Sequence, residues 1–223
     1  MTDARIHRAT PLPTGIPGLR ALAIASNDAF PRHAHDEYGL GLIETGGHRS
    51  WSGIGEVEAG PGMVITVNPG EIHDGRPVAG ALRRWRMVYV EPAALARLVG
   101  GDARETDLAR PALVDRTVGR RLLALFATLQ EATAGPAGTE EAAAALLGLA
   151  FRRHGAAAPA PETASPSIAR ARQRIDDDSA GTTSLAALAA ECGLSPYQLI
   201  RGFLREVGAT PEAYRLQART RRA

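Results

Sequence analysis

The sequence contains no lysine, a single cysteine and few aromatic residues, which make up 4% of the chain. The lone Cys192 excludes an intramolecular disulfide framework and a cysteine-based zinc site. The longest apolar stretch, Ala142 to Phe151, is alanine-rich and shorter than the roughly 20 residues that cross a bilayer. Met1 to Arg5 leads into no apolar core of a secretory signal. We therefore expect a cytoplasmic protein with no membrane partner.

All 26 basic residues are arginine, and acidic residues balance them unevenly along the chain. Residues 165–223 hold 9 arginines and 6 acidic residues, whereas the first 164 hold 17 arginines and 18 acidic residues. The length of 223 residues and the hydrophobic fraction of 44% fit an ordinary globular protein of one or two domains. The mildly basic end permits a nucleic-acid partner there.

The first 90 residues predict β-structure, because Gly, Pro, Asn and Asp separate short apolar runs. These runs are Gly39–Glu44, Val57–Ala59, Met63–Val67 and Trp85–Val90. Short strands at close spacing favour a sandwich or a small barrel. Alternation within the last run places Trp85, Met87 and Tyr89 on one face of a strand.

Helical spacing begins after Glu91-Pro92, in the segments Arg116–Thr133 and Glu140–His154. Gly135 to Gly138 separates the two, which predicts an antiparallel helix pair. The pair either packs only on the β-domain or also forms a dimer contact, and the sequence leaves both open. The Ala/Pro-rich segment 155–166 predicts a linker, and everything beyond it has helical character.

The most informative segment begins at Ser184 and ends at Phe203. Ser184 is a predicted N-cap for a first helix that buries Leu185, Leu188 and Ala189. Gly193 suits the positive φ that ends this helix and turns the chain. Ser195 then caps a second helix with Pro196 in its first turn and with Leu199 and Phe203 pointing inward.

Two short helices around a glycine turn predict either a helix-turn-helix or an ordinary α-hairpin. In the first case the second helix enters the major groove of double-stranded DNA. The predicted DNA-binding residues are Ser195, Pro196, Tyr197, Gln198, Ile200, Arg201 and Arg205. We expect Arg201 to contact a guanine edge and Arg205 to contact a phosphate.

Residues 184–203, followed by Val207-Gly208 and Thr210-Pro211, strongly resemble the first half of the DNA-binding domain of AraC-type transcription regulators. The resemblance implies two helix-turn-helix units joined by a long helix, with recognition helices in adjacent major-groove turns. This sequence matches the first unit and the start of the joining helix, and it ends at Ala223. Half of the implied DNA contacts are therefore missing, which predicts weaker binding by the chain alone.

Two histidine segments near the N-terminus resemble the two sequence motifs of cupin barrels. His33, His35 and Glu37 share one face if their segment is a strand, and Glu71 and His73 follow a Pro-Gly turn. Together with the C-terminal match, they look like the ligand-binding domain of AraC-type regulators. The predicted ligand-binding residues are His33, His35, Glu37, Trp51, Glu71, His73, Trp85 and Tyr89.

These side chains leave three interpretations open. The polar ones can hydrogen-bond a small polar molecule between apolar walls supplied by Trp51, Trp85 and Tyr89. Alternatively, three imidazoles and a carboxylate can bind iron, manganese or zinc. The glutamate of metal-dependent cupins falls here at Gly39 or Leu40, so Glu37 would have to substitute for it. In the third case the histidines are structural and bind nothing.

We therefore expect an α+β chain with an N-terminal cupin-like β-barrel, a helical hairpin and a C-terminal all-α helix-turn-helix subdomain. The expected parts are a ligand-sensing barrel at 1–92, a dimerisation region at 93–154, the linker 155–166 and a DNA-binding subdomain at 167–223. This predicts a homodimeric regulator rather than an enzyme, with no cofactor. A metal-dependent cupin dioxygenase or isomerase is the alternative function, and a curtailed regulator that titrates full-length relatives is a third.

Overall fold

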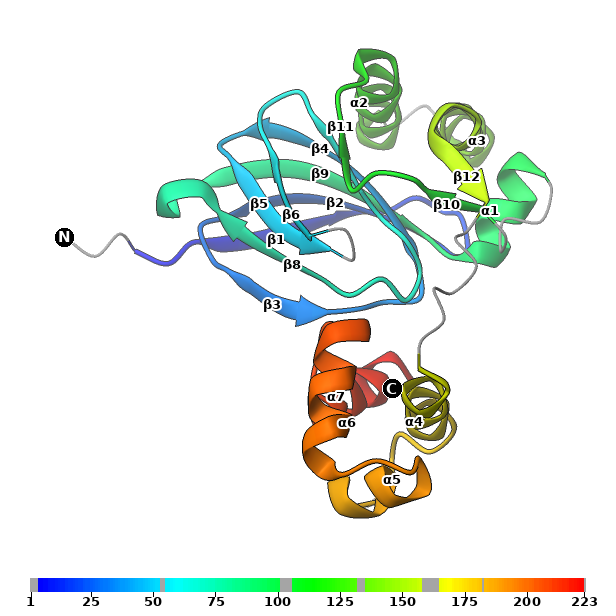
Figure 1. Cartoon of the computed structure of the whole chain (residues 1–223). Coiled ribbons are helices and arrows are strands. Elements are labelled where there is room, and N and C mark those ends of the chain that lie inside the picture. The colour runs from blue at the N-terminus through cyan, green and yellow to red at the C-terminus, as the bar shows by residue number, and fades with distance from the viewer. Residues whose placement is uncertain are drawn as a thin grey trace. The chain divides into compact units, whose positions relative to one another are not determined.

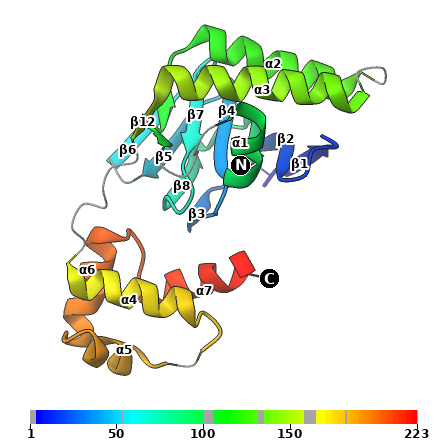
Figure 2. The same ribbon diagram turned by 90° about the vertical axis from the view of Figure 1, so that its right-hand side faces the viewer.

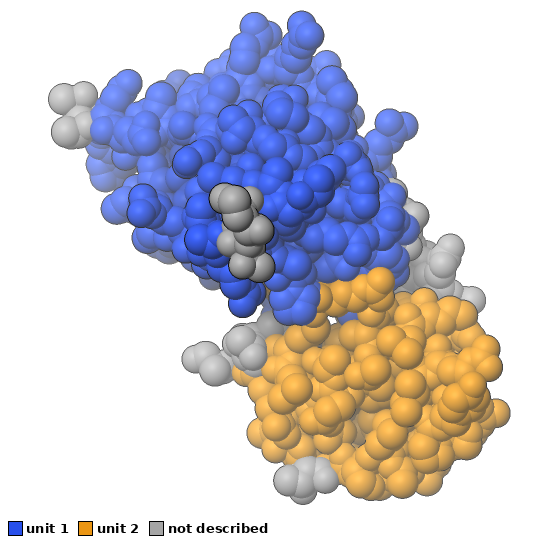
Figure 3. Space-filling view, turned by 90° about the vertical axis from the view of Figure 1, so that its left-hand side faces the viewer, with its two compact units in different colours: residues 1–31, 36–158 blue, residues 32–35, 159–223 orange. Residues whose placement is uncertain are grey.

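The computed structural model describes residues 4–52, 55–100, 106–131, 135–157, 165–181 and 183–222. They form two compact units, which Figure 3 distinguishes by colour. The N-terminal unit comprises Met1–Pro31 and Asp36–Ala158, and the C-terminal unit comprises Arg32–His35 and Pro159–Ala223. No helix in the described part of the chain is long and apolar enough to span a bilayer.

The N-terminal unit is built on two antiparallel sheets (Figure 1). The first has the strand order β1-β2-β9-β4-β7-β11. Its strands are β1 (His7–Leu12), β2 (Leu19–Ser26), β9 (Arg83–Val90), β4 (Tyr38–Thr45), β7 (Val64–Val67) and β11 (Ala112–Leu113). The second has the order β3-β8-β5-β6, with β3 (Phe30–His33), β8 (His73–Pro77), β5 (His48–Ser52) and β6 (Gly55–Ala59). A 3-10 turn, η1 (Val78–Gly80), precedes β9.

The predicted β-barrel is corrected to two separate sheets. The four predicted apolar runs lie in the strands β4, β6, β7 and β9, apart from Met63, which precedes β7. A closed barrel also requires hydrogen-bonded pairing between the edge strands of the two sheets. In the described part of the chain, the edge strands β1, β11, β3 and β6 each pair with one neighbour only. The N-terminal unit is therefore rich in sheet without a closed barrel, within an α+β chain.

Helices cover one face of the six-stranded sheet (Figures 1 and 2). They are α1 (Pro92–Val99), α2 (Arg116–Gln130) and α3 (Gly135–His154). Their buried side chains, such as Leu95, Phe126 and Leu147, share one hydrophobic cluster with Leu40 and Val88 of the sheet. We call this cluster the helix-side core. Because it includes both sheet and helices, residues 93–154 do not form a core of their own.

Helices α2 and α3 form the predicted antiparallel pair, since the start of α2 contacts the end of α3 through Asp115 and His154. The predicted start of the second helix, at Glu140, was wrong. The predicted separator, Gly135 to Gly138, is the first turn of α3. Gly135 has a φ of 55°, and it begins the helix without interrupting it.

The predicted linker is only partly described. Its first residues form β12 (Gly155–Ala157), which pairs with β10 (Thr106–Leu108), so they belong to the N-terminal unit. At its other end, Ser165 precedes α4, which begins at Pro166. Residues 158–164 of the predicted linker lie outside the described residues.

The C-terminal unit is helical, as the sequence predicted. Its helices are α4 (Pro166–Asp177), α5 (Leu185–Glu191), α6 (Pro196–Glu206) and α7 (Pro211–Arg222). Helix α4 buries Ile168, Ala171 and Ile175, which recur at helical spacing. Leu199 and Phe203 of α6 are fully buried, and Phe203 packs edge-on against Tyr214 of α7.

Asp115 links the first turn of α2 to the last turn of α3. Its carboxylate caps α2 by accepting hydrogen bonds from the backbone N–H groups of Thr117 and Val118, at 2.9 and 3.1 Å. It also lies 2.8 Å from Nε2 of His154, in the last turn of α3. Burial raises the pKa of Asp115, but the bonds from His154 and from the two backbone groups outweigh burial, so the pKa lies below its usual value.

We predict that Asp115→Ala lowers the free energy of unfolding by about 1–2 kcal/mol, the usual effect of removing an N-cap. Asp115→Asn retains an oxygen that can accept a cap bond, and it should lose less. Because the folded-state pKa is depressed, the carboxylate stabilises the fold above its unfolded pKa of about 3.9, and that stabilisation is lost at lower pH. Urea unfolding should show the gap between wild type and Asp115→Asn narrowing below about pH 4; a constant gap would contradict this assignment.

Candidate functional site

A second hydrophobic cluster lies between the two sheets, and we call it the inner core. Its buried residues are Ile24, Ile43, Ala59, Ile65, Val67, Trp85 and Met87. Tyr89 packs against it, which confirms that Trp85, Met87 and Tyr89 share one face of β9. A Cβ at Gly39 or Gly41 would lie within 2.6 Å of the Met87 side chain, so these glycines of β4 make room for Met87.

Two predicted ligand residues, Glu37 and Tyr89, are brought together by Arg20. Arg20 donates from Nε and Nη2 to the two carboxylate oxygens of Glu37, at 3.0 and 2.5 Å. Its guanidinium lies 5.0 Å from the centre of the Tyr89 ring. Burial raises the pKa of Tyr89. Glu37 is therefore engaged in a bidentate ion pair with a partner that sequence reasoning missed.

Glu71 and His73 lie together at the turn between β7 and β8. The Glu71 carboxylate accepts hydrogen bonds from the backbone N–H and the side-chain amide of Asn68, at 2.9 and 3.2 Å. Burial raises the pKa of Glu71. Nδ1 of His73 lies 3.0 Å from the carbonyl oxygen of Glu71. These contacts brace the turn, which is a structural role for Glu71.

Trp51 does not share a wall with Trp85. It alternates along β5 with His48, which faces the inner core and lies edge-on to Trp85 with ring centres 5.8 Å apart. Trp51 therefore lies on the other face of β5, beside Arg49, which pairs with Glu58. The structure does not place Trp51 with Trp85 and Tyr89 in the inner core, because the register with β6 turns His48 inward and Trp51 outward.

The predicted histidine site is not assembled within one unit. His33 and His35 fall in the segment 32–35 that groups with the C-terminal unit, whereas Glu37, Glu71 and His73 belong to the N-terminal unit. The strand β3 ends at His33, so the strand that was to align Glu37 with the histidines does not extend that far. Within the described residues, no three His, Cys, Asp or Glu side chains are grouped as metal ligands.

The inner core contains two polar groups that sequence reasoning missed, Arg83 and His48. Arg83 is fully buried, and His48 is 8% exposed. A sequence signal for Arg83 existed, because it occupies the position two residues before Trp85 on the inward face of β9. Its guanidinium lies 5.0 Å from the Trp85 ring and 5.3 Å from the Phe30 ring.

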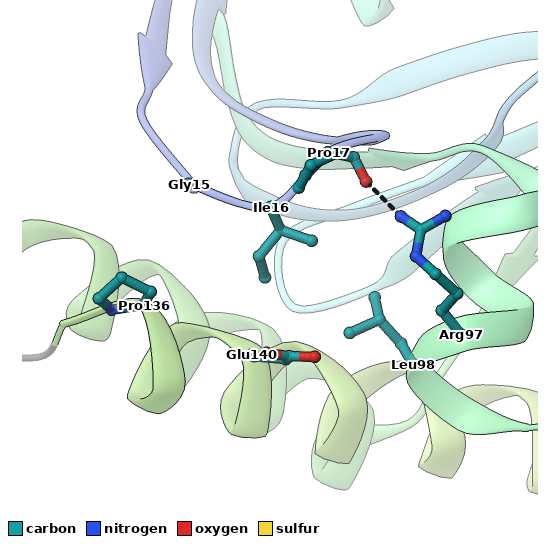
Figure 4. Close-up of a pocket in the computed structure, with 7 residues that line it drawn as sticks. All are labelled: Gly15, Ile16, Pro17, Arg97, Leu98, Pro136 and Glu140. Carbon is teal, nitrogen blue, oxygen red and sulfur yellow. Dashed lines mark hydrogen bonds between the residues drawn. The ribbon is translucent and has the colours of Figure 1, made fainter.

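A pocket of about 290 Å³ lies elsewhere on the N-terminal unit, and none of the predicted ligand residues lines it (Figure 4). Ile16 and Leu98 supply apolar walls, and Pro136 and Glu140 of α3 line another side. Nη2 of Arg97 donates to the carbonyl oxygen of Pro17 at 2.7 Å, so this guanidinium is already engaged at the rim. The pocket offers a small and mainly apolar space.

In the C-terminal unit, the local signals at α5 and α6 are confirmed. Ser184 caps α5 by accepting from the N–H of Ala187 at 3.1 Å. Gly193, with a φ of 69°, follows the end of α5. Ser195 caps α6 reciprocally with Gln198, at 3.2 and 2.9 Å. The side-chain oxygen of Gln198, predicted to face DNA, is thus part of a capping box.

Tyr197, Arg201 and Arg205 lie on the face of α6 away from Leu199 and Phe203. Pro196 and Ile200 lie nearer the buried side of the helix. Pro196, Tyr197, Arg201 and Arg205 are exposed, and Ile200 is half-buried. The Arg201 guanidinium lies 5.6 Å from the centre of the Tyr197 ring, and Arg205 pairs with Glu206. Arg215 and Arg219 of α7 instead donate to backbone carbonyls, at Thr183 and Ser179, so they hold the unit together.

Gly202 lets α6 pack closely against α4. A Cβ at this position would lie 2.5 Å from Cδ1 of the buried Ile168. We predict that Gly202→Ala lowers the melting temperature, because crowding a packed core costs about 1–3 kcal/mol and exceeds the roughly 1 kcal/mol gained in helix propensity.

The matched test is a double-mutant cycle with Ile168→Val, which removes the clashing methyl group. Gly202→Ala should be tolerated better in the Ile168→Val background than in the wild type, as measured by thermal unfolding of each variant. A higher melting temperature for Gly202→Ala alone would show that α4 and α6 are not in close contact here.

Comparison with known proteins places the N-terminal unit in a family. The model of the AraC-like ligand binding domain matches residues 17–150. Among solved structures, the AraC-like transcriptional activator CuxR is 15% identical with a TM-score of 0.48, over 99% of this chain and 82% of CuxR. None of the curated proteins matches the chain.

Two further structures are similar to less than half of this chain. A putative mannose-6-phosphate isomerase from Ralstonia eutropha JMP134 is 18% identical over 41% of this chain and 90% of its own, with a TM-score of 0.37. The Cnp3 cupin domain of Schizosaccharomyces pombe is 10% identical over 43% and 74%, with a TM-score of 0.37. Because the family model spans more than half of the sequence, the chain belongs to the family of the AraC-like ligand binding domain.

Proposed function

We propose that the chain is a transcription regulator of the AraC type, in which a small molecule bound by the N-terminal unit controls DNA binding by the C-terminal helices. This makes it a binding protein rather than an enzyme. The family match supports ligand sensing. The observation that carries DNA binding is the two-sided character of α6, which buries Leu199 and Phe203 while its opposite face stays exposed.

That exposed face has the chemistry of a reading surface. Arg201 presents a guanidinium, whose planar fork matches the two acceptors of a guanine edge in the major groove. Tyr197 is 67% exposed and lies one turn before Arg201, so its ring is available to contact a thymine methyl or a sugar. Helices α5 and α6, joined by the turn at Gly193, form the helix-turn-helix of this proposal, with α6 as the recognition helix.

We expect Arg201→Ala to lower the affinity for a selected site by about 10- to 100-fold, the range for one bidentate base contact, and to change binding to random DNA much less. Fluorescence anisotropy measures both, with a duplex enriched from a randomised library and its scrambled version. Arg174→Ala, in a residue that pairs with Asp178 and Glu191, removes the same charge elsewhere in the unit as a control. An equal loss of affinity for both duplexes would show that Arg201 contacts a phosphate and does not read a base.

We further propose that α2 forms the contact of a homodimer. Its outward face carries Arg120, Leu123, Ala124 and Ala127 at helical spacing, and Leu123 is 40% exposed. The small alanines allow a second helix to approach closely. The helix-side core leaves this face of α2 uncovered within the unit.

Sedimentation equilibrium should show a dimer for the wild-type chain and a monomer for Leu123→Glu, because the substitution buries an unpaired charge at the contact. Ile6→Glu, at a similarly exposed position ahead of β1, should leave the dimer intact. A dimer that survives Leu123→Glu would place the contact elsewhere.

A further inference from the structure

Arg83 is a buried cation whose hydrogen bonds are incomplete. Nη2 donates to the carbonyl oxygens of Asp28 and Gly75, at 3.0 and 3.2 Å. Nε and Nη1 are buried, and neither finds an acceptor among the described residues. Burial lowers the pKa of Arg83 to about 10, so the side chain remains charged at neutral pH. Two donor nitrogens therefore lack an acceptor among the described residues, and aromatic rings and carbonyl oxygens, but no carboxylate, offset the positive charge.

Two other arginines of this unit, Arg86 and Arg20, are each paired with a carboxylate. Arg86 donates to Glu44 at 2.5 Å, and Arg20 binds Glu37 through two bonds. Arg83 is more deeply buried than either, yet no carboxylate pairs with it in the part of the chain that the structure describes. Buried charges in proteins are normally paired, because removing an ion from water is costly.

His48 adds a third unsatisfied group beside the same aromatic ring. Its Nδ1 is buried and has no partner among the described residues. Burial and the nearby charge of Arg83 lower the pKa of His48 to about 4, so the imidazole is neutral at physiological pH. Gly75 allows this packing, since a Cβ there would come within 3.1 Å of the His48 ring.

We infer that Arg83 and His48 form a carboxylate-recognition site, and that the effector of the proposed regulator is a small organic acid whose apolar body lies against Trp85 and the inner core. A carboxylate accepts two bonds from a guanidinium fork and supplies the missing negative charge. A neutral polyol could satisfy the donors but would leave the charge uncompensated. The inference rests on the proposed function, because it assigns the chemical class of the ligand that the N-terminal unit senses.

The test compares carboxylates with their own amides, which have nearly the same shape and no charge. Hexanoate and benzoate should raise the melting temperature of the full chain at millimolar concentration, and calorimetry should give affinities at least about 10-fold above those of hexanamide and benzamide, the range for a hydrogen bond to a charged group. Arg83→Met should abolish this preference. Arg84→Met, at the adjacent exposed position of β9, should preserve it.

Two further measurements test carboxylate binding without the Arg83→Met variant, in case that variant misfolds. The NMR titration of His48 in the wild type should show its pKa rising from about 4 when benzoate binds, because an anion favours the imidazolium; benzamide should not shift it. Trp51→Phe leaves Trp85 as the only tryptophan, so its fluorescence should respond to the carboxylates directly.

Several results would overturn the inference: no binding of either carboxylate, equal affinity for acid and amide, or binding unaffected by Arg83→Met. The substitution Leu98→Trp fills the pocket of Figure 4. If it abolishes carboxylate binding, the ligand binds in that pocket and the inference is wrong. DNA binding is measured separately. If carboxylates fail while the chain still binds its selected duplex, only the ligand class is wrong. If they bind through Arg83 but the chain binds no DNA, the regulator proposal is wrong.

Discussion

The alternation of side chains along β9 is the constraint on which the N-terminal unit depends. Val88 and Val90 point into the helix-side core, whereas Trp85 and Met87 point into the inner core between the sheets. One central strand thus divides the unit into two cores. The helix-side core joins hydrophobic side chains of the sheet and the helices and supplies cohesion, while the inner core also holds Arg83 and His48. The proposed ligand site and the helix-side core thus lie on opposite faces of the same sheet.

In a chain without lysine, arginine supplies every basic side chain other than histidine. In the C-terminal unit, Arg215 and Arg219 donate to carbonyl oxygens of the loop after α4. Arg20 uses its planar fork on a carboxylate. Each of these roles suits the fixed donor geometry of arginine better than the point charge of lysine. Arg201 on α6 and Arg83 in the inner core are the two whose roles we assign to partners outside the chain.

Local signals in the sequence predicted most of the fold, because they act within a few residues. The caps at Ser184 and Ser195, the turn at Gly193 and the four β-runs all lie where their spacing indicated. Contacts between residues far apart in the chain could not be predicted from the sequence. Arg20 reaches Glu37 across 17 positions, and Asp115 reaches His154 across 39. The inward position of His48 and the outward position of Trp51 depend on the register of β5, which pairing with β6 sets.

The proposed function requires that ligand binding in one unit changes DNA binding by the other. Thermodynamic linkage makes such coupling reciprocal, so the ratio of the two DNA affinities must equal the ratio of the two ligand affinities. The direct measurement is a DNA titration by anisotropy with and without saturating ligand, together with a ligand titration with and without DNA. We expect the ligand to change the DNA affinity, and DNA to change the ligand affinity, by the same factor, and this factor should differ from one. A DNA affinity that is identical with and without bound ligand would contradict the account.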